Sequence, residues 1–534
     1  KPQTPNPKPQ TPNPKPHHHK QLSQMPTLPY LLLSLLFHPI LTQSEDKYVV
    51  EQLTEYCRHG ARTAYVYFPN ASTVKEYGIA TLTPNGHRMH YLLGRELRKK
   101  YPGIFEPKDG GNNFDYEVFA SAIARTQLSA ISQLVGLFPF GSGDNVTVQD
   151  PSGWLPNYHD IDVELPQFSE SLPDGYKPFP LNIKSAEQDF LFLPNEGKNS
   201  CPGGYHTDLE SRKVAYKKFN YVVGDLPELL EKEGFSCKKI YNKDVWDIGT
   251  LGQLASEILC YENYFGHIPP EMSEDVWVRL KRFQSFKFYM DFLDTRMLRL
   301  KGETSARAIL QGMENWVNKN PYRRKFRLYS GHDTGLYPHT VRFNLTDLEC
   351  ELDKVHGRTP KRRCEGAPGF AAHYLYELSK KKSNGKYYVR ILYNNEPFKI
   401  CDYNDDRFYC EFEEFKKTYS SIMFEDPRVF LEVCGNKERI NAALNKDAFV
   451  LEEFVSKRIM YWGIGILALM VSLIIWRVLK IKHSVDIEEE LEEESRARQI
   501  FDIDQITREI EAGKPSIVDV QIPEDSLADP NEKL

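Results

Sequence analysis

The sequence predicts an α/β protein with a central sheet, because segments with the character of strands alternate with segments of helical periodicity. Two short polar motifs, at residues 58–62 and 331–333, follow predicted strands. Reactive groups in such sheets gather at the carboxyl ends of the strands. The chain has 534 residues, of which 40% are hydrophobic and 12% aromatic, which suits one large domain or two moderate ones with a substantial core.

The first predicted strand is KYVVEQLTEYC, residues 47–57, and it ends at Arg58. Its pattern is not purely apolar, because Glu51, Gln52 and Glu55 lie within it. Such polarity is unusual for a strand buried in a parallel sheet.

Two helices are expected after this strand. Residues 82–101, LTPNGHRMHYLLGRELRKKY, predict a turn and then a helix, since Pro84-Asn85-Gly86 breaks the chain and apolar residues then line one side. Residues 125–138, RTQLSAISQLVGLF, have apolar residues at helical spacing. The apolar positions of the two helices are Leu92, Leu93 and Leu97, and Leu128, Ile131, Leu134 and Val135.

The middle of the chain predicts loops and then long helices. Residues 150–205 are rich in proline and glycine, which favours loops and short strands. Long helices are expected over 273–318, as a cap or a second layer. RKFRLYSGHDTG, residues 324–335, predicts a short strand over 326–329 that opens into a glycine loop. The helical pattern is carried by Val276, Leu280, Phe283, Phe286, Met290 and Leu293.

The beginning of the chain has the features of a leader. Residues 1–24 contain KPQTPNP twice, and their prolines exclude them from helix or sheet. Residues 25–44 begin with Met25 and hold an apolar run that is typical of a signal peptide and too short to span a bilayer. We expect cleavage near Ser44. A buried N-terminal strand is the alternative.

A second apolar segment lies near the other end. IMYWGIGILALMVSLIIW, residues 459–476, is uncharged and about as long as a membrane span. We expect a transmembrane helix over 459–479, and a buried core helix is the alternative. Basic residues follow directly, so the positive-inside rule puts the acidic tail, 480–534, in the cytosol and residues 45–458 on the other side of the membrane.

The composition of residues 45–458 agrees with this placement. The sequons at Asn70, Asn145 and Asn344 are compatible with glycosylation. All nine cysteines fall in this segment, as an oxidising compartment favours, and the odd number leaves one over, for which Cys57 is the candidate. The formal net charge of −6 and the lack of a long basic run argue against nucleic acid as a partner.

The motif YCRHGAR, residues 56–62, places an imidazole between two permanent cations. Arg58 and Arg62 should lower the pKa of His59, which keeps a neutral nitrogen available as nucleophile or base. The two guanidinium groups can bind a dianion, and Gly60 lets the backbone approach its oxygens. A phosphate monoester exploits both properties, because its oxygens need cations and its phosphorus can be attacked in line.

The second motif, Gly331-His332-Asp333, adds a further donor and a carboxylic acid. His332 can donate to phosphate oxygens. Asp333 can protonate the departing alkoxide and then accept a proton from water while a phosphohistidine is hydrolysed. This division of labour needs no metal. The alternative is a basic turn and an unrelated loop, with the two motifs far apart.

With these motifs the sequence resembles the histidine acid phosphatase family, the branch that contains the lysosomal and prostatic acid phosphatases. The family signature R-H-G-x-R lies at 58–62, and its later His-Asp pair follows a strand. The resemblance runs roughly over 48–434, because further stretches are similar in the same order: LTPNGHRMHYLLGRELRKKY, RTQLSAISQLVGLFP, LFLPNEGKNSCP, PGFAAHYLYEL and KYYVRILYNNEP.

The resemblance implies a mixed central sheet flanked by helices, a smaller helical cap domain and acid phosphatase activity without a cofactor. It implies that His59 is the phosphorylated nucleophile and that Asp333 is the proton donor. The phosphate ligands that it implies are Arg58, Arg62 and His332.

The chain departs from the family at two positions. Ala64 replaces the proline that ends the first signature, which should loosen the turn. Counting back from Arg125 places Phe119 where the family has a further phosphate-binding arginine, and phenylalanine cannot coordinate phosphate. Either Arg125 or another cation compensates for it, or the activity is reduced.

The cysteines follow the family in part. The resemblance implies the disulfides Cys201–Cys434 and Cys401–Cys410. Cys237, Cys260, Cys350 and Cys364 remain without an assignment.

The function expected is therefore an acid phosphatase that hydrolyses small-molecule or phosphoprotein phosphomonoesters in a lysosomal or vacuolar lumen or outside the cell, anchored by one helix as a type I membrane protein. A phytase-like or inositol polyphosphate phosphatase is an alternative. It is less favoured, because some of those enzymes carry His-Ala-Glu where this chain has His332-Asp333. A catalytically weak membrane receptor on the same fold is the other alternative, favoured by Phe119 alone.

Overall fold

The computed structural model describes several separate ranges of the chain. The chain divides into two compact units. The first unit, Lys1–Glu425, holds the sheet and most helices, and the second, Asp426–Leu534, holds α14 (Pro427–Cys434). The described residues are 48–66, 76–106, 113–146, 170–186, 188–192, 201–401, 408–421, 423–435, 470 and 472–477.

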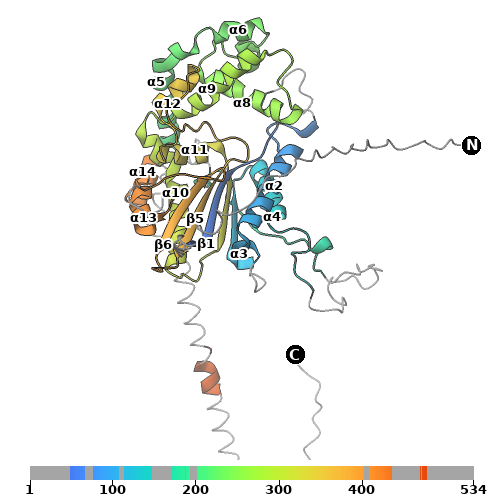
Figure 1. The fold of residues 1–534 in the computed structure, drawn as a ribbon, viewed down its shortest axis with the longest axis vertical. Helices are drawn as coiled ribbons and strands as arrows, with labels where there is room; N and C mark the ends of the chain where they lie inside the picture. The colour runs from blue at the N-terminus through green and yellow to red at the C-terminus, as the bar shows by residue number, and fades with distance from the viewer. Residues whose placement is uncertain are drawn as a thin grey trace, which may run out of the picture. The chain divides into compact units, whose positions relative to one another are not determined.

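A mixed sheet forms the centre of the first unit (Figure 1). Its strand order is β3-β2-β4-β1-β5-β6-β7, and β8 pairs with β6. The pairs among β3, β2, β4 and β1 are parallel, and the pairs among β1, β5, β6, β7 and β8 are antiparallel. The strands are β1 (Tyr48–Arg58), β2 (Tyr116–Ala120), β3 (Leu181–Ile183), β4 (Phe326–Gly331), β5 (His373–Lys381), β6 (Tyr387–Tyr393), β7 (Glu396–Pro397) and β8 (Cys410–Glu411).

Successive residues of the central strands point to opposite faces of the sheet, as the period of two requires. On one face, tyrosines of β1, β4 and β5 pack against α10 (Thr295–Val317), α11 (Asp333–Arg342) and α13 (Phe412–Ser420). On the other face, aliphatic residues of the same strands pack against α2 (Pro84–Lys100), α3 (Pro102–Phe105) and α4 (Ala124–Leu137). The first set is Tyr56, Tyr329, Tyr374 and Tyr376, and the second is Leu53, Leu328 and Leu375.

The start of α2 differs from the prediction. Residues 84–86 do not break the chain but form the first turn of the helix, and Thr83 is the N-cap, with its Oγ1 accepting a hydrogen bond from Gly86 N (3.2 Å). The proline is tolerated because the first residue of a helix has no intrahelical partner for its N–H. Gly86 is required by packing, since a Cβ there would lie 2.2 Å from Ala61 O.

The predicted helix after β2 is confirmed as α4, but its buried face is partly polar. Arg125, Ser129 and Gln133 are buried, whereas Ile131, which the apolar spacing placed on the buried side, is 39% exposed. Polar residues are therefore turned inward here, toward the end of β1.

A smaller set of helices forms the predicted cap at one end of the sheet (top of Figure 1). These helices surround an apolar core of their own, with Leu251, Ile258, Trp277, Leu280 and Phe286 among its buried members. The long helices predicted over 273–318 are thus divided, since α9 belongs to the cap and α10 to the layer on the sheet. The cap helices are α5 (Pro202–Phe219), α6 (Leu226–Lys232), α7 (Cys237–Tyr241), α8 (Ile248–Phe265), α9 (Glu274–Met290) and α12 (Leu348–Val355).

The remaining short elements are 3₁₀ turns, at η1 (Asn113–Asp115), η2 (Pro173–Gly175) and η3 (Asn220–Val223). They lie in connections, and η2 falls within residues 150–205, where loops and short strands are expected.

Disulfides close two short loops of the first unit. Cys401–Cys410 is confirmed, and Cys350–Cys364 assigns two of the cysteines that the sequence left open. Cys201 and Cys434 are each disulfide-bonded. Cys57 is confirmed as a free thiol, but it is not alone, because Cys237 and Cys260 are free as well among the described residues.

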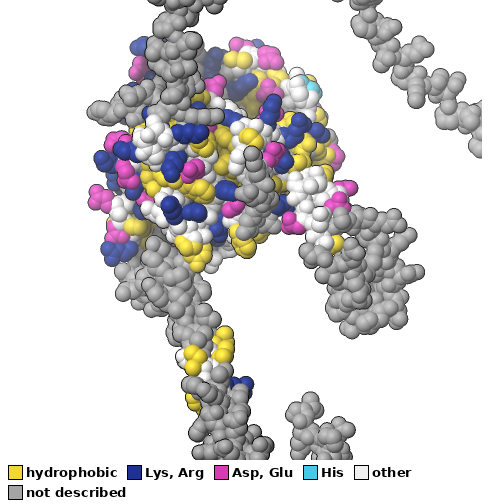
Figure 2. Space-filling model, turned by 60° about the horizontal axis from the view of Figure 1, so that its bottom comes forward, with side chains coloured by type: hydrophobic (Ala, Val, Ile, Leu, Met, Phe, Trp, Pro, Cys, Tyr) yellow, Lys and Arg dark blue, Asp and Glu magenta, His cyan; other side chains and the backbone are white. Residues whose placement is uncertain are grey.

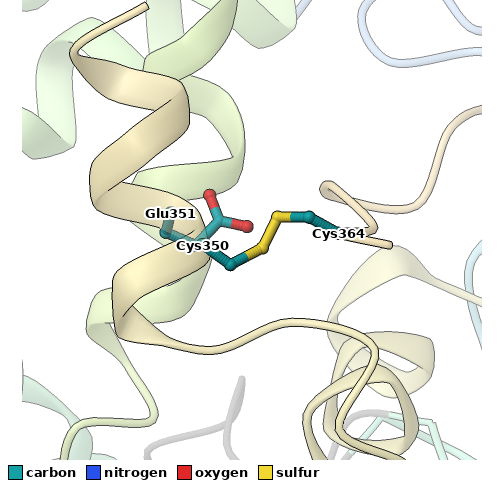
Figure 3. A group of neighbouring side chains, drawn as sticks. All are labelled: Cys350, Glu351 and Cys364. Atoms are coloured by element: carbon teal, nitrogen blue, oxygen red, sulfur yellow. A yellow bond between two sulfur atoms is a disulfide. The ribbon is translucent and has the colours of Figure 1, made fainter. Parts of the chain in front are cut away.

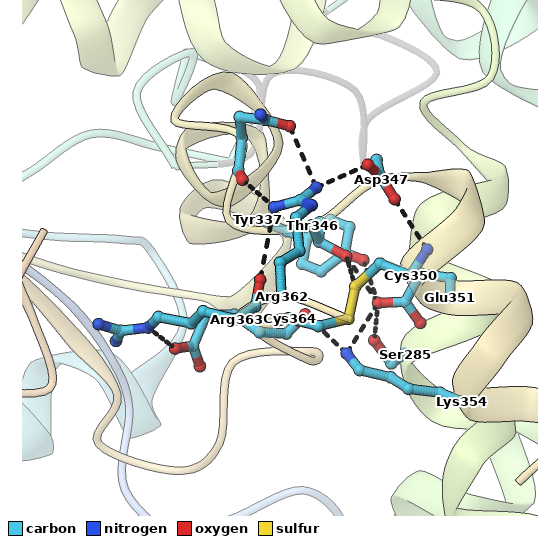
Figure 4. Close-up of a disulfide and its surroundings, with 12 residues drawn as sticks. Ser285, Tyr337, Thr346, Asp347, Cys350, Glu351, Lys354, Arg362, Arg363 and Cys364 are labelled. Atoms are coloured by element: carbon cyan, nitrogen blue, oxygen red, sulfur yellow. Dashed lines mark hydrogen bonds and ion pairs between the residues drawn. A yellow bond between two sulfur atoms is a disulfide. The ribbon is translucent and has the colours of Figure 1, made fainter. Parts of the chain in front are cut away.

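Glu351 lies beside the Cys350–Cys364 disulfide (Figure 3). This grouping has the ligand types of a metal site, but the sulfur atoms are bonded to each other and offer no thiolate. The carboxylate of Glu351 instead accepts hydrogen bonds from Ser285 Oγ (2.8 Å), Thr346 Oγ1 (2.8 Å) and Lys354 Nζ (3.1 Å) (Figure 4). The cluster therefore joins α12 to α9 and has a structural role.

The surface of the first unit mixes both signs of charge. In the view of Figure 2, Lys and Arg side chains alternate with Asp and Glu, with hydrophobic side chains between them. Of the predicted glycosylation sites, Asn145 and Asn344 are exposed.

Several sequence predictions concern residues outside the described part of the chain. These are the low-complexity segment 1–24, the signal peptide 25–44, the sequon at Asn70, the tail 480–534 and most of the expected membrane span over 459–479. Among the residues that the structure describes, no helix is both long enough and apolar enough to cross a bilayer.

Candidate active site

The sheet brings the two polar motifs together. Because β1 and β4 are parallel neighbours, with Arg58 opposite Gly331, residues 58–62 and 331–333 leave the sheet side by side. His59 N donates a hydrogen bond to Gly331 O (3.0 Å), and His59 O accepts one from Ala371 N (3.1 Å). The alternative of two distant loops is therefore wrong.

His59 is buried and has one ring nitrogen engaged. Its Nδ1 lies 2.8 Å from Gly60 O, a carbonyl that can only accept, so Nδ1 carries the proton and Nε2 keeps its lone pair. Burial lowers the pKa of His59 well below its ordinary value, and the charges of Arg58 and Arg125 lower it further. The imidazole is thus neutral at acidic pH, as a nucleophile must be.

Arg58 connects the two motifs. Its Nη2 forms an ion pair with Asp333 Oδ2 (2.8 Å), its Nη1 donates to Pro368 O (2.5 Å), and the guanidinium lies 4.4 Å from the centre of the Phe370 ring. Burial lowers the pKa of Arg58, although the Asp333 carboxylate opposes this effect. Among the described residues, its buried Nε has no hydrogen-bond partner, so one donor is unsatisfied there.

Arg62 is held against the cap. Its Nη1 donates to Thr63 O (2.8 Å) and lies 3.8 Å from Glu257 Oε2, which comes from α8. Its guanidinium lies 4.2 Å from the ring centre of Tyr65, whose N donates to the same Glu257 oxygen (2.6 Å). Burial acts to lower the pKa of Arg62, but the Cys260 thiol and the Glu257 carboxylate outweigh it and raise the pKa. Arg62 therefore stays charged.

Arg125 and His332 face each other across the site. Arg125 Nη2 donates to Tyr65 OH (3.0 Å) and lies 3.5 Å from His332 Nδ1. His332 Nε2 lies 2.9 Å from Ser121 Oγ. Burial and the charge of Arg125 lower the pKa of His332 to about 3, so this imidazole is neutral too. Its ring centre is 5.5 Å from that of His59.

Asp333 is the first residue of α11, and His332 is its N-cap. Oδ1 of Asp333 accepts from Thr334 N (2.9 Å) while Oδ2 is paired with Arg58, and the side chain is 19% exposed. Burial acts to raise the pKa of Asp333, but the nearby positive charges of Arg58 and Arg62 and the His332 ring outweigh it, so the pKa is lowered. In the free site Asp333 is therefore a carboxylate.

Phe119 takes no part in the cluster around His59. It lies in β2 and stacks on Tyr329, with ring centres 5.1 Å apart and planes 12° apart. A guanidinium approaches His332 from Arg125 instead, which reaches the site from the first turn of α4.

Gly60 is needed for a different reason than the sequence suggested. A Cβ on Gly60 would lie 2.3 Å from Gly86 O, and the Gly60 N–H donates to Ser129 Oγ (3.0 Å). The glycine therefore lets the first motif pack against the start of α2 and α4.

Four further residues contribute to this arrangement, and the motifs in the sequence do not point to them. Tyr65 touches two of the arginines, Ser121 fixes the His332 ring, Phe370 lies under Arg58, and Glu257 holds the loop after the motif. Glu257 comes from the cap, far along the chain from the first motif, and no local sequence pattern predicts its contact with Arg62. Tyr65 lies three residues after Arg62, and Ser121 lies four residues before Arg125, and this nearness is the signal that the sequence offers.

A known protein family matches most of this chain, including the residues of both motifs. The family description "Histidine phosphatase superfamily (branch 2)" matches residues 42–394, which include both motifs. The chain belongs to the histidine phosphatase superfamily, branch 2.

Within this superfamily the chain is similar to named acid phosphatases. It is 25% identical over 377 residues to the prostatic acid phosphatase of Bos taurus, covering 68% of this chain and 82% of that protein. It is also 25% identical over 382 residues to the lysosomal acid phosphatase of Xenopus laevis, covering 68% of this chain and 74% of that protein.

Among solved structures, the chain is similar to two bacterial phytases at low sequence identity. The phytase of Klebsiella sp ASR1 superposes with a TM-score of 0.47 at 12% identity, covering 71% of this chain and 97% of that one. The phytase of Citrobacter braakii gives a TM-score of 0.46 at 15% identity, covering 73% and 99%.

Proposed function

We propose that this histidine phosphatase is an acid phosphatase that hydrolyses phosphate monoesters through a phosphohistidine at His59. The observation that carries the proposal is the arrangement around His59. A neutral imidazole with a free Nε2 lies among the guanidinium groups of Arg58, Arg62 and Arg125. This combination suits an attack on a dianionic phosphoryl group.

In the first step, His59 Nε2 attacks phosphorus while the ester P–O bond breaks and its electron pair leaves with the alkoxide. The three arginines stabilise the charge on the equatorial oxygens, and His332 lies where it can contribute a hydrogen bond. The Gly60 carbonyl holds the Nδ1 proton, so the charge that develops on the imidazole is stabilised by a fixed acceptor.

Asp333 supplies the proton for the alkoxide. In the free site the Arg58 charge keeps this carboxyl ionised, but a bound phosphate dianion engages Arg58 and adds negative charge beside Asp333. Both changes raise the affinity of Asp333 for a proton. After the alcohol leaves, the Asp333 carboxylate takes a proton from water, whose oxygen attacks phosphorus as the P–N bond breaks.

This electrostatic arrangement explains why we expect activity at acidic pH. His59 stays neutral there because its pKa is lowered, whereas Asp333 needs low pH to take up its proton because its pKa is lowered too. The rate should therefore fall as the pH rises.

Arg125 takes the place of the arginine that Phe119 replaces. Its guanidinium is buried, approaches His332 and is oriented by Tyr65 OH. We propose that Arg125 is a phosphate ligand on this basis, and that no cofactor takes part.

The setting of the enzyme is a further part of the proposal. We propose a signal peptide over 25–44, a luminal or extracellular catalytic segment over 45–458, one transmembrane helix over 459–479 and an acidic cytoplasmic tail over 480–534. Two disulfides, the exposed sequons at Asn145 and Asn344, and similarity to lysosomal acid phosphatases support a lysosomal or extracellular location. The pairing of Cys201 with Cys434 and glycosylation at Asn70 stay predictions.

The test is hydrolysis of p-nitrophenyl phosphate by the full-length protein at about pH 5, a value between the ordinary pKa values of carboxyl and imidazole groups. We expect turnover that is lost in His59→Ala and unchanged by a metal chelator. His206→Ala is the matched control, because His206 is exposed on the cap, away from the motifs. Acid-labile ³²P on His59 identifies the intermediate.

An inactive wild-type protein that is correctly folded would favour the membrane receptor instead. Turnover that persists in His59→Ala would show that the nucleophile is another group.

A further inference from the structure

We infer that Glu55, Gln133 and His90 form a buried chain of hydrogen bonds that holds one proton and positions the backbone of Arg58 and His59 for catalysis. These are positioning residues, since none touches the substrate phosphate in the proposed reaction. The inference rests on the proposed function for its effect on activity, but the chain itself has a second, independent readout in protein stability.

The geometry of the chain is continuous. Glu55 Oε2, on β1, lies 2.5 Å from the side-chain amide of Gln133, on α4. The other end of that amide lies 2.9 Å from Nδ1 of His90, on α2, and His90 Nε2 lies 3.0 Å from Arg58 O. The side chains of Glu55, Gln133 and His90 are all fully buried. Three elements thus converge on the carbonyl that precedes the nucleophile.

The partners of His90 determine how many protons the chain holds. Arg58 O can only accept, so His90 Nε2 must carry a proton. If the Gln133 oxygen faces His90, Nδ1 must carry a proton as well, and the imidazolium is balanced by a Glu55 carboxylate that accepts from the Gln133 amide nitrogen.

If the Gln133 amide is turned, its nitrogen donates to His90 Nδ1 and its oxygen accepts from a protonated Glu55. Both arrangements satisfy every partner along the chain and have the same total charge. They differ in the orientation of the Gln133 amide and in whether Glu55 or His90 holds the proton. Without that proton, one hydrogen bond along the chain is lost in either arrangement.

Burial favours the arrangement with a protonated Glu55. It raises the pKa of Glu55 to about 8, against a smaller opposite effect of the Gln133 hydrogen bond, and it lowers the pKa of His90. Glu55 Oε1 has no hydrogen-bond partner among the described residues, which costs less for a neutral carboxyl than for a carboxylate.

In the described part of the chain, no cation lies beside Glu55 that would hold it ionised. Its neighbours in register are Leu328 on β4 and Leu375 on β5. The titratable groups that face it are the Cys57 thiol on β1, His90 on α2 and the Tyr101 hydroxyl after α2, and Tyr101 donates to the Glu377–Arg390 ion pair on β5 and β6. The anomalous polar residue of the first predicted strand is thus part of the support of the motif.

The sign of the stability effect follows from the raised pKa. The folded protein binds the Glu55 proton more tightly than the unfolded chain, whose carboxyl has a pKa near 4.5. The stabilisation is complete below that value and is lost as the pH rises through about 8. A protein with this chain is therefore more stable at acidic pH.

The test compares Glu55→Gln with the wild-type full-length protein. A glutamine donates to the Gln133 oxygen at every pH, so it reproduces the protonated arrangement without the ability to ionise. We expect Glu55→Gln to keep the wild-type kcat at about pH 5. In the wild type, the urea concentration at the midpoint of unfolding should fall between about pH 5 and pH 8.5, and the part of this fall that comes from Glu55 should be absent in the variant. Glu117→Gln, on β2 and outside the chain, should leave that decline in place.

The effect on positioning is tested with His90→Phe. This variant removes both hydrogen bonds, and we expect kcat to fall about tenfold or more while KM changes little, because small displacements of a nucleophile reduce the rate strongly. Its urea transition shows whether it folds.

Two results would overturn the inference: an unchanged urea-midpoint decline in Glu55→Gln, or a folded His90→Phe with wild-type kcat. If the wild type hydrolyses no phosphate monoester, the proposed function fails, and the urea series still decides whether the proton chain exists.

Discussion

In the proposed reaction, the reactivity of His59 depends on a single carbonyl and a small number of charges. Gly60 O fixes the proton on Nδ1, and burial together with Arg58 and Arg125 keeps the ring neutral. An arginine on each side would not achieve this at the surface, where water screens the charges. The neutral state of the His59 ring therefore depends on its buried setting as well as on the residues of the motif.

Asp333 is the residue whose role can be measured through the leaving group. Asp333→Asn cannot donate a proton, so the loss should be small for p-nitrophenyl phosphate, whose leaving group departs as a stable anion, and larger for an alkyl phosphate such as β-glycerophosphate. We expect the alkyl substrate to lose about 10²-fold more than the aryl one, within the usual range of acid catalysis. The measurement is kcat/KM for both substrates at about pH 5.

Equal losses for the two substrates would assign to Asp333 only the positioning of Arg58, with which it forms an ion pair. The wild-type ratio of the two rates is the control, since it corrects for the intrinsic difference between aryl and alkyl esters.

At the scale of elements, α2 and α4 cross with almost no space between their backbones. A Cβ on Gly94, in α2, would lie 2.2 Å from Gln133 O, and a Cβ on Gly136, in α4, would lie 2.2 Å from Tyr91 O. This contact puts His90 and Gln133 within hydrogen-bond distance of each other. The two glycines therefore set the position of the helices that support the first motif.

Gly94→Ala should destabilise the protein by about 1–3 kcal/mol, because the methyl group forces the two helices apart. Gly103→Ala, in α3, is the matched control, since a Cβ there meets no atom within 4 Å. That variant should be neutral or stabilising by up to about 1 kcal/mol. Urea unfolding of both variants checks the prediction, and similar stabilities would show that α2 and α4 can separate at no cost.

The sequence predicted the elements that carry the motifs, because their patterns are local. The strand ending at Arg58, the helix over 125–138 and the strand before Gly331 are all present. Since neighbouring parallel strands end at the same edge, the meeting of the two motifs could be predicted as well.

Contacts made across the fold could not be predicted in this way. Glu257 reaches Arg62 from the cap, and helices α5 to α8 were not recognised in the sequence. The sequence predicts a break at the start of α2, because Pro84 and Gly86 are typical of a turn, whereas in the structure Thr83 caps the helix. Glu55 looked out of place in a strand, and only the positions of Gln133 and His90 explain it.

At the scale of the whole molecule, disulfides make the stability of the protein depend on the redox conditions of its compartment. Cys350–Cys364 joins α12 to the following loop and closes a loop with a sequence separation of 14. In the chain-entropy account such a crosslink contributes about 3 kcal/mol by restricting the unfolded chain. The cap should therefore depend on oxidation.

The double variant Cys350→Ser, Cys364→Ser should lose about 2–3 kcal/mol of stability and become insensitive, at this site, to a reducing agent. Cys237→Ser is the control, because Cys237 is a free thiol whose hydrogen bond to Val245 O a serine can keep. Thermal unfolding with and without dithiothreitol measures both. Equal losses from the two substitutions would mean that the crosslink contributes nothing beyond ordinary packing.

The place of β1 in the sheet also affects how the polypeptide must be made. Its hydrogen-bonded neighbours are β4 and β5, which begin only at Phe326 and His373. During synthesis β1 therefore emerges early, with both edges unpaired. It stays unpaired until more than half of the chain has been translated. Long-range pairings of this kind form slowly, and the folding intermediates that precede them are prone to aggregate. Efficient production of the enzyme should therefore depend on chaperones that shield nascent chains until the ribosome has passed β5.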